Sequence, residues 1–276
     1  MKDGLVISNE NKTIKEVAKL KLKKYRKSLS KCIVESYYPI LYALDGGYKI
    51  ETLFVFENFF RKRLEELDLI KRLKSKNVKI TYVSEKVFKK ISYITDYDGL
   101  LAIVKTAEQP LDSLKANNRG MYLILESIEQ VSNLGSLIRV ADNAGVSAVI
   151  IANERVDIYN PGVIRSSVGT VFTIPIFNAG LEQAQDWCLK NNIETLVTSP
   201  GANKSLYEIS CKDNRPIAIV VGNEYKGVSE SWQGSNKYKA KLVKIPMFGK
   251  ANSMNVTASA AVILYEVLRQ RKLNRL

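Results

Sequence analysis

Three stretches in the last three-fifths of the chain share one pattern, in which an apolar strand-like run leads into a polar loop with Gly or Asn and then into a helix. They span residues 121–153, 217–229 and 245–271 of the 276 residues. Strands that alternate with helices predict a mostly parallel sheet, because a parallel pair needs a long crossover connection. In such a sheet the ligand crevice lies beyond the carboxyl ends of the strands, where all three polar loops would begin.

The third stretch shows the pattern most completely. Pro246 follows a strand-like run and cannot donate a ladder hydrogen bond, and Gly249 permits a tight loop. Asn252 or Ser253 is predicted to cap a helix whose apolar residues recur at three- and four-residue steps over residues 254–268. Taken alone, this stretch is more typical of a capped helix packed on a sheet than of a functional site.

Composition excludes several classes of site. The chain has a formal net charge of +14 and no histidine, so histidine bases, histidine metal ligands and a histidine pH switch are all excluded. Cys32, Cys188 and Cys211 are far apart and form no CxxC pair, which argues against zinc and against a disulfide framework, so we expect small buried residues in a reducing interior. No signal-like or membrane-spanning apolar run is present; we therefore expect a cytoplasmic protein with neither metal nor membrane partner.

The positive charge is concentrated in the first half. Residues 1–107 hold 23 Lys and Arg against 13 Asp and Glu, whereas residues 108–276 hold 19 against 15. Residues 12–31 alone carry nine Lys and Arg, and their apolar residues fall near helical spacing, which predicts one basic amphipathic helix. Membrane-surface binding and a plain solvated surface are alternatives, but RNA phosphate contact is favoured, because the apolar face lacks Trp and Phe.

The order of elements predicts two domains. Strands at residues 32–34, 52–56, 78–83 and 99–105 alternate with helices at 36–44, 61–76 and 84–90, which predicts a small basic α/β domain over residues 1–107 that binds RNA. Residues 108–118 contain Pro110, Asn117 and Asn118 and are predicted to form a linker. The second domain, residues 119–276, is predicted to have strands at 122–126, 148–152, 171–176, 194–198 and 217–221, with helices at 162–168 and 182–191 between them.

In order and content, the three stretches resemble the three motifs of the SpoU/TrmH family of S-adenosylmethionine-dependent RNA ribose 2′-O-methyltransferases, part of the knotted SPOUT superfamily. The quoted segments are MYLILESIEQVSNLGSLIRVADNAGVSAVIIAN, IAIVVGNEYKGVS and IPMFGKANSMNVTASAAVILYEVLRQR. The resemblance implies a deep C-terminal trefoil knot, a homodimer, and an N-terminal substrate-binding domain similar to a ribosomal RNA-binding fold. The chain departs from the usual motif conservatively, with Met254 and Thr257 where a leucine and a serine are common.

The resemblance also implies roles for individual residues. Arg139 matches the arginine of the first motif, which is implicated in activating the ribose hydroxyl. A guanidinium stays protonated, so we expect it to bind the adjacent phosphate and stabilise a developing alkoxide rather than act as a base. Without the resemblance it would be a surface helical arginine, and Asn133 a helix cap. Asn133, Glu224, Ser253 and Asn255 are expected near the target nucleotide. Gly222, Ile245, Met247, Gly249 and Met254 are expected to hold S-adenosylmethionine.

Other nucleotide motifs are absent from the sequence. Gly249 and Lys250 lack the spacing of a P-loop, no GxGxxG fingerprint occurs, and no metal-ligand cluster is present. The resemblance therefore implies an S-adenosylmethionine-dependent RNA 2′-O-ribose methyltransferase, with ribosomal RNA favoured as substrate because a sizeable basic N-terminal domain looks more like the members that act on ribosomal RNA. The alternatives are a tRNA 2′-O-methyltransferase, a base methyltransferase of the same superfamily, and a non-catalytic RNA-binding or ribosome-assembly protein of the same fold.

Overall fold

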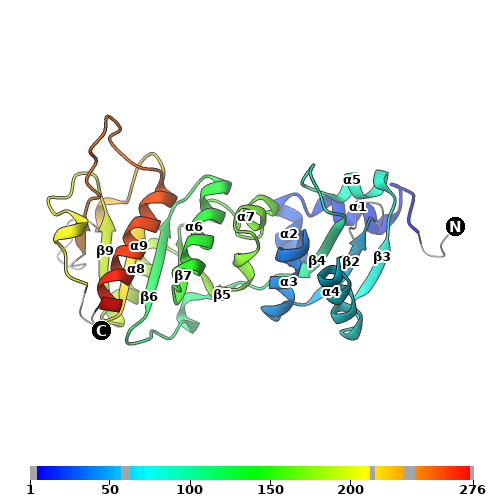
Figure 1. Cartoon of the computed structure of the whole chain (residues 1–276), viewed down its shortest axis with the longest axis horizontal. Coiled ribbons are helices and arrows are strands. Elements are labelled where there is room, and N and C mark those ends of the chain that lie inside the picture. Colours follow the sequence, from blue (N-terminus) through cyan, green and yellow to red (C-terminus); the bar gives the residue numbers. More distant parts are fainter. Residues whose placement is uncertain (1–4, 57–62, 212–214, 233–239, 274–276) are drawn as a thin grey trace. The chain divides into compact units, whose positions relative to one another are not determined.

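The computed structural model describes residues 5–56, 63–211, 215–232 and 240–273 (Figure 1). The chain forms two compact units. Unit 1 comprises Met1–Ala107 and Asp157–Thr173, and unit 2 comprises Glu108–Val156 and Ile174–Leu276. The chain therefore passes from one unit to the other three times. A short segment from the second half of the sequence, Asp157–Thr173, belongs to the first unit.

Unit 1 is built on a mixed four-stranded sheet. The strand order is β1-β4-β2-β3; β4 pairs antiparallel with both β1 and β2, and β2 pairs parallel with β3. Apolar residues of α1, β1, β2, α5 and β4 form one buried core. The elements are β1 (Lys31–Glu35), α3 (Tyr37–Asp45), β2 (Ile50–Val55), α4 (Leu64–Ser75), β3 (Lys79–Tyr82), α5 (Glu85–Ile91) and β4 (Leu100–Lys105).

The basic N-terminal segment folds as two helices, α1 (Lys12–Lys19) and α2 (Lys23–Leu29), so the prediction of a single helix over residues 12–31 is wrong. Leu22 has an extended backbone, which interrupts the helix. Leu20 is buried whereas Leu22 is 60% exposed. Leu20, directly after α1, therefore packs in the core of unit 1. A continuous helix with Leu22 on its apolar face does not form.

The segment Asp157–Thr173 is anchored in unit 1 by a buried ion pair. Arg26 Nε donates to Asp157 Oδ2 at 2.7 Å, and both side chains are less than a tenth exposed. The other oxygen of Asp157 accepts the backbone N–H of Tyr159. Two charges out of water need such partners, because an unpaired buried charge is strongly destabilising.

The same segment contains α7 (Pro161–Ser166) and a 3-10 turn, η2 (Thr170–Phe172). The predicted strand at residues 171–176 is wrong, since β8 begins only at Ile176. Val171 and Phe172 are buried in the 3-10 turn, so burial accounts for this apolar run without a strand. The Phe172 ring packs edge-on against Tyr48 with centroids 5.0 Å apart. A short buried apolar run of this kind cannot be distinguished from a strand by periodicity.

Unit 2 contains a seven-stranded sheet in the order β11-β9-β10-β6-β7-β8-β5. Every pairing in it is parallel, which confirms the predicted parallel α/β architecture. The strands are β5 (Gln109–Pro110), β6 (Met121–Glu126), β7 (Ala148–Ala152), β8 (Ile176–Ala179), β9 (Glu194–Thr198), β10 (Ile217–Val221) and β11 (Lys241–Val243).

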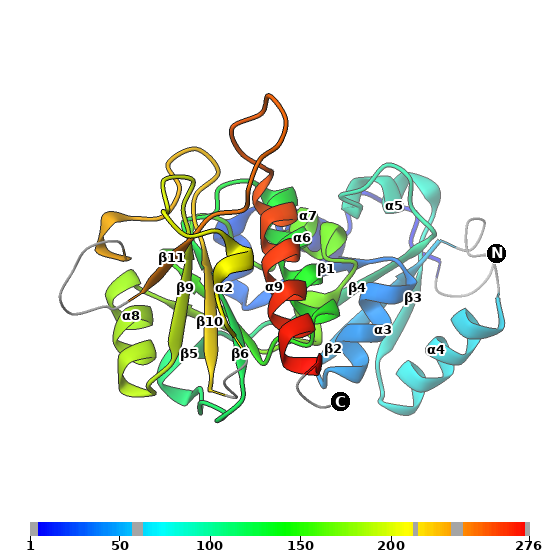
Figure 2. The ribbon, with the colours of Figure 1, turned by 60° about the vertical axis from the view of Figure 1, so that its left-hand side comes forward.

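Helices cover both faces of this sheet. On one face, Trp187 and Cys188 of α8 (Leu181–Lys190) pack in a core with Tyr122 and Ile124 of β6. Residues between these point to the opposite face, because strand side chains alternate. There α6 (Val131–Asn143) and α9 (Val256–Leu273) pack against each other, α6 also contacting β7 and α9 contacting β10 (Figure 2).

The three cysteines are free and buried, as predicted. Burial raises the pKa of the Cys211 thiol to about 11 and that of Cys188 to about 12.

Across the four described ranges, no helix is both long and apolar enough to cross a membrane.

Candidate active site

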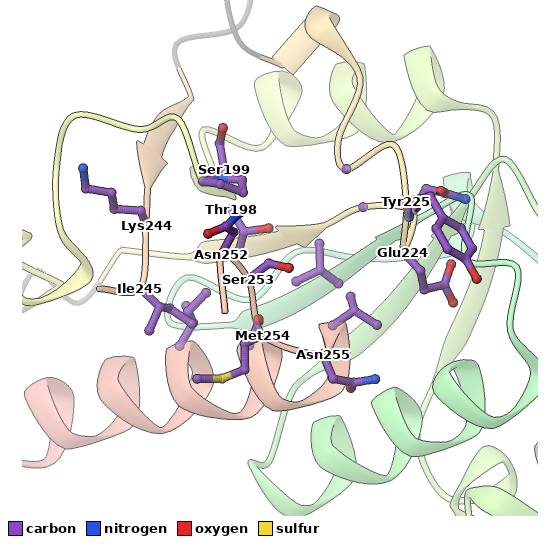
Figure 3. Close-up of a pocket in the computed structure, with 18 of the residues that line it drawn as sticks. Thr198, Ser199, Glu224, Tyr225, Lys244, Ile245, Asn252, Ser253, Met254 and Asn255 are labelled. Carbon is purple, nitrogen blue, oxygen red and sulfur yellow. Dashed lines mark hydrogen bonds between the residues drawn. The ribbon is translucent and has the colours of Figure 1, made fainter. Parts of the chain in front are cut away.

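A cavity of about 420 Å³ opens in unit 2, where the strand order reverses direction. Strand β6 lies between β7, which follows it in the chain, and β10, which comes much later. A crevice beyond the carboxyl ends of strands at such a point is the usual ligand site of a parallel sheet. The walls come from the loops after β9, β10 and β11 and from the start of α9 (Figure 3).

The loop after β10 makes a turn that only glycine permits at its first position. A Cβ at Gly222 would lie 2.3 Å from the backbone C and O of Gly227, far inside van der Waals contact. Asn223 closes the turn, because its Oδ1 accepts the N–H groups of Tyr225 and Lys226. Its Nδ2 donates to the carbonyl of Ser127, just after β6. The loop is thus fixed both to itself and to the neighbouring strand end.

Glu224 projects from this loop to the beginning of α6. Its carboxylate accepts the backbone N–H groups of Glu129 at 3.1 Å and Gln130 at 3.0 Å, and the Nδ2 of Asn133 at 3.0 Å. Partial burial acts to raise the pKa of Glu224, but the hydrogen bonds from Asn133 and the backbone outweigh it, so the pKa lies below its ordinary value. Glu224 is therefore an ionised acceptor whose lowered pKa makes it a poor proton acceptor.

Asn133 links Glu224 to the third loop, which lies between β11 and α9. It lies in the first turn of α6 rather than before the helix, and its Oδ1 accepts the Nδ2 of Asn255 at 3.3 Å. Asn255 also caps α9, because its Oδ1 accepts the N–H of Thr257 at 2.8 Å. The predicted cap at Asn252 or Ser253 is thus wrong by two to three residues. A row of side chains, Asn255–Asn133–Glu224, joins the three loops.

The structure brings most of the residues singled out from the sequence into this one cavity. Arg139 and Gly249 are the two that do not line it; both are exposed. Arg139 lies six residues beyond Asn133 on α6, about 240° further around the helix axis, so the two side chains leave the helix in different directions. Gly249 lies in the exposed part of the loop between β11 and α9. The lining residues among the candidates are Asn133, Gly222, Glu224, Ile245, Met247, Ser253, Met254 and Asn255.

Sequence reasoning missed Thr198, Ser199 and Lys244, which also line the cavity (Figure 3). Thr198 ends β9 and is followed by Ser-Pro-Gly, which is a further strand end with a polar loop. The helix predicted after the second stretch is also wrong: over residues 215–232, the loop after β10 is followed by a 3-10 turn, η4 (Glu230–Trp232). Trp232 turns inward there and donates from Nε1 to the buried Glu126.

Comparison with known proteins identifies the family of both parts of the chain. Residues 120–265 match the SpoU rRNA methylase family, and residues 11–102 match the MRM3-like substrate binding domain. The 23S rRNA (guanosine-2′-O-)-methyltransferase RlmB of Shewanella oneidensis is 30% identical over 210 residues, which cover 74% of this chain and 83% of the relative.

Two solved structures are similar over nearly the full length. A crystal structure of an RNA 2′-O ribose methyltransferase has 34% sequence identity and a TM-score of 0.85, covering 97% of this chain and 99% of that one. An AdoMet-bound rRNA methyltransferase from Sinorhizobium meliloti has 26% identity and a TM-score of 0.85, covering 96% and 97%. The chain belongs to the SpoU rRNA methylase family and carries an N-terminal MRM3-like substrate-binding domain. The predicted RNA ribose 2′-O-methyltransferase is confirmed at the level of the family.

Proposed function

We propose that this chain transfers the methyl group of S-adenosylmethionine to a ribose 2′-hydroxyl of ribosomal RNA. The observation that carries the proposal is the row Asn255–Asn133–Glu224, which joins the three motif loops around one cavity at the carboxyl ends of the strands. The relative from Shewanella oneidensis supports ribosomal RNA as the substrate, and the Sinorhizobium meliloti structure supports the cofactor.

The cavity has the features that an adenosyl ligand requires. Val221, Ile245 and Ile263 give it apolar walls, and the missing Cβ of Gly222 lets the backbone approach closely. When bound, S-adenosylmethionine supplies an electrophilic methyl group on a sulfonium. We assign its binding to Gly222, Ile245, Met247 and Met254, with Gly249 in the flanking exposed loop.

Arg139 is our candidate for the catalytic residue. Its side chain is exposed and has no hydrogen-bond or ion-pair partner within the described ranges. A guanidinium remains protonated at any working pH, so Arg139 binds the phosphate beside the target ribose and stabilises the developing alkoxide, and a phosphate oxygen accepts the proton. Glu224 positions Asn133 rather than taking a proton, while Ser253 and Asn255 orient the nucleotide.

The remaining assignments concern the substrate-binding part. We assign RNA binding to the basic residues 1–107, the linker to residues 108–118 and the methyltransferase domain to residues 119–276. Within these bounds, Asp157–Thr173 belongs to unit 1, and Gln109–Pro110 of the linker forms β5 of the unit 2 sheet. The helices α1 and α2 offer exposed Lys side chains for phosphate contact, whereas Arg26 of α2 is buried against Asp157. Ribosomal RNA is favoured over tRNA, and the cytoplasm is the compartment in which the chain would meet it.

Family resemblance further supports a C-terminal trefoil knot and a homodimer. Along α9, Ala258, Ala261 and Val262 are only half-buried, and Tyr265 is 52% exposed. Small apolar side chains at this spacing allow a second helix to approach closely, so we assign this face to the contact with a second copy. Light scattering after size-exclusion chromatography measures the dimer. Stretching single molecules measures the knot, which would leave the extended chain shorter than its length in residues requires.

The test of the function is transfer of radiolabelled methyl groups to unmodified ribosomal RNA and tRNA, followed by digestion to nucleosides. A 2′-O-methyl nucleoside from ribosomal RNA is the expected product. Label on tRNA alone would change the substrate, and label on a base would change the reaction. Absence of S-adenosylmethionine binding would favour the non-catalytic RNA-binding protein. Arg139→Lys should lose most turnover while keeping cofactor affinity, whereas the control Arg119→Lys, exposed in unit 2 before β6 and outside the cavity, should lose neither.

A further inference from the structure

Unit 1 contains its own cavity, of about 280 Å³, separate from the site described above. All its lining residues belong to unit 1. Its walls come from the end of β1 with the start of α3 (residues 33–39), from the loop before β4 (residues 94–96), and from α7 with the turn after it (residues 161–168). None of the residues assigned above to methyl transfer lies in it.

The walls of this unit 1 cavity are fixed to one another. The Glu35 carboxylate accepts the backbone N–H groups of Tyr93 at 2.8 Å and Ile94 at 3.2 Å, which joins β1 to the loop before β4. On the other side, the backbone of Gly169 packs so closely on Pro39 that an added Cβ would lie 2.5 Å from the Pro39 Cα. The cavity is therefore preformed, as small-ligand sites usually are.

Two lining residues have strained backbones. Ser36 has φ 75° and ψ 157°, a region used almost only by glycine, and Val168 has φ 54°, which is rare for a β-branched residue. Asp98 supports the first of these, because its carboxylate accepts the N–H of Tyr37 at 3.0 Å. Such strain persists where the surrounding structure holds it, and it concentrates at ligand clamps.

Three exposed side chains of the unit 1 cavity are available for recognition. Tyr38 is 54% exposed, and its ring is supported by an edge contact with Tyr37 at 5.1 Å between centroids. Asp96 and Arg165 are exposed, and in the described part of the chain neither side chain has a hydrogen-bond or ion-pair partner. The cavity thus offers an aromatic ring, an unused carboxylate and an unused guanidinium.

We propose that this cavity receives one unstacked guanine of the RNA substrate, an inference that rests on the function proposed above. Guanine carries the N1–H and N2–H donors on one edge, which suit the Asp96 carboxylate. It carries the O6 and N7 acceptors on another edge, which suit the fork of Arg165. Tyr38 provides a surface for stacking. Adenine would turn its N6 amino donor toward the guanidinium, so the pair of charges selects guanine.

The first experiment measures nucleotide binding to the full-length protein by calorimetry, with S-adenosylhomocysteine present to occupy the cavity of unit 2. GMP should bind at least about fivefold more tightly than AMP, CMP or UMP, the lower limit for a good bidentate base contact. Asp96→Asn should abolish this preference, and the matched control Asp68→Asn, exposed on α4, should retain it. Equal binding of GMP and AMP, or no binding of either, would overturn the proposal.

The second experiment measures the affinity for unmodified ribosomal RNA by filter binding, which needs no methyl transfer and so stays interpretable if the proposed reaction fails. Asp96→Asn should weaken RNA binding at least about fivefold. Charge alone predicts the opposite, because removing a carboxylate favours a polyanion. Loss of GMP binding with unchanged RNA affinity would assign the cavity to a free guanine nucleotide and contradict the proposal. Tyr38→Ala should weaken RNA binding, whereas the control Tyr207→Ala should not.

Discussion

The contact between Glu224 and Asn133 can be tested by a double-mutant cycle with Glu224→Gln and Asn133→Ala. Glu224 accepts three hydrogen bonds, two from the backbone and one from Asn133. A glutamine keeps one acceptor but turns an NH₂ group toward the other donors. Hydrogen bonds to a charged group contribute about 1.5–3 kcal/mol each, less where water has access. We therefore expect Glu224→Gln to lower the free energy of unfolding of unit 2 by about 2 kcal/mol.

Tryptophan fluorescence reports the unfolding of unit 2 alone, because the two tryptophans of the chain, Trp187 and Trp232, are both buried in that unit. Urea unfolding followed by tryptophan fluorescence should give a coupling energy of about 1 kcal/mol between the two substitutions. Asn133→Ala combined with Glu85→Gln, an exposed residue of α5 in unit 1, should be additive. Additivity within about 0.3 kcal/mol for Glu224 and Asn133 as well would refute the argument that these residues act as a unit.

Three further predictions follow from the same contacts. Gly222→Ala should abolish S-adenosylmethionine binding in calorimetry, because its Cβ would meet the Gly227 backbone at 2.3 Å; retained affinity would show that the loop can move. Arg26→Leu should destabilise unit 1 by about 3 kcal/mol by leaving Asp157 buried and unpaired, so that the circular-dichroism transition precedes the tryptophan transition; coincident transitions would contradict this. Since the folded pKa of Glu224 lies below 4.5, its stabilisation is present above that pH and is lost as pH falls through the folded pKa; the stability difference between wild type and Glu224→Gln should therefore shrink on acidification.

The parallel sheet and the three loops could be predicted from the sequence because their signals are local. A buried strand such as β10, Ile217–Val221, is a continuous apolar run, and Gly222 and Asn223 mark its end. Helix caps were harder to place. Asn252, Ser253 and Asn255 are all good capping residues, and only the path of the loop selects Asn255.

The features that could not be predicted from the sequence depend on contacts between residues that are far apart in the chain. Val171 and Phe172 look like a strand until the rest of unit 1 buries them. Arg26 looks like one more cation for RNA, but it is paired with Asp157, 131 residues away. The direction of Arg139 depends on the phase of α6 relative to the sheet, which the position of a residue in a motif does not specify.

The return of Asp157–Thr173 to unit 1 limits how this protein can be recombined. A gene fusion that transplanted only residues 1–107 would leave Arg26 without its carboxylate and would remove the turn that packs on Pro39. The recipient would need its own equivalent of these residues between two of its sheet strands. Substrate-binding and methyl-transferring parts of this architecture are therefore expected to be inherited together, and exchange between relatives should require matching both pieces at once.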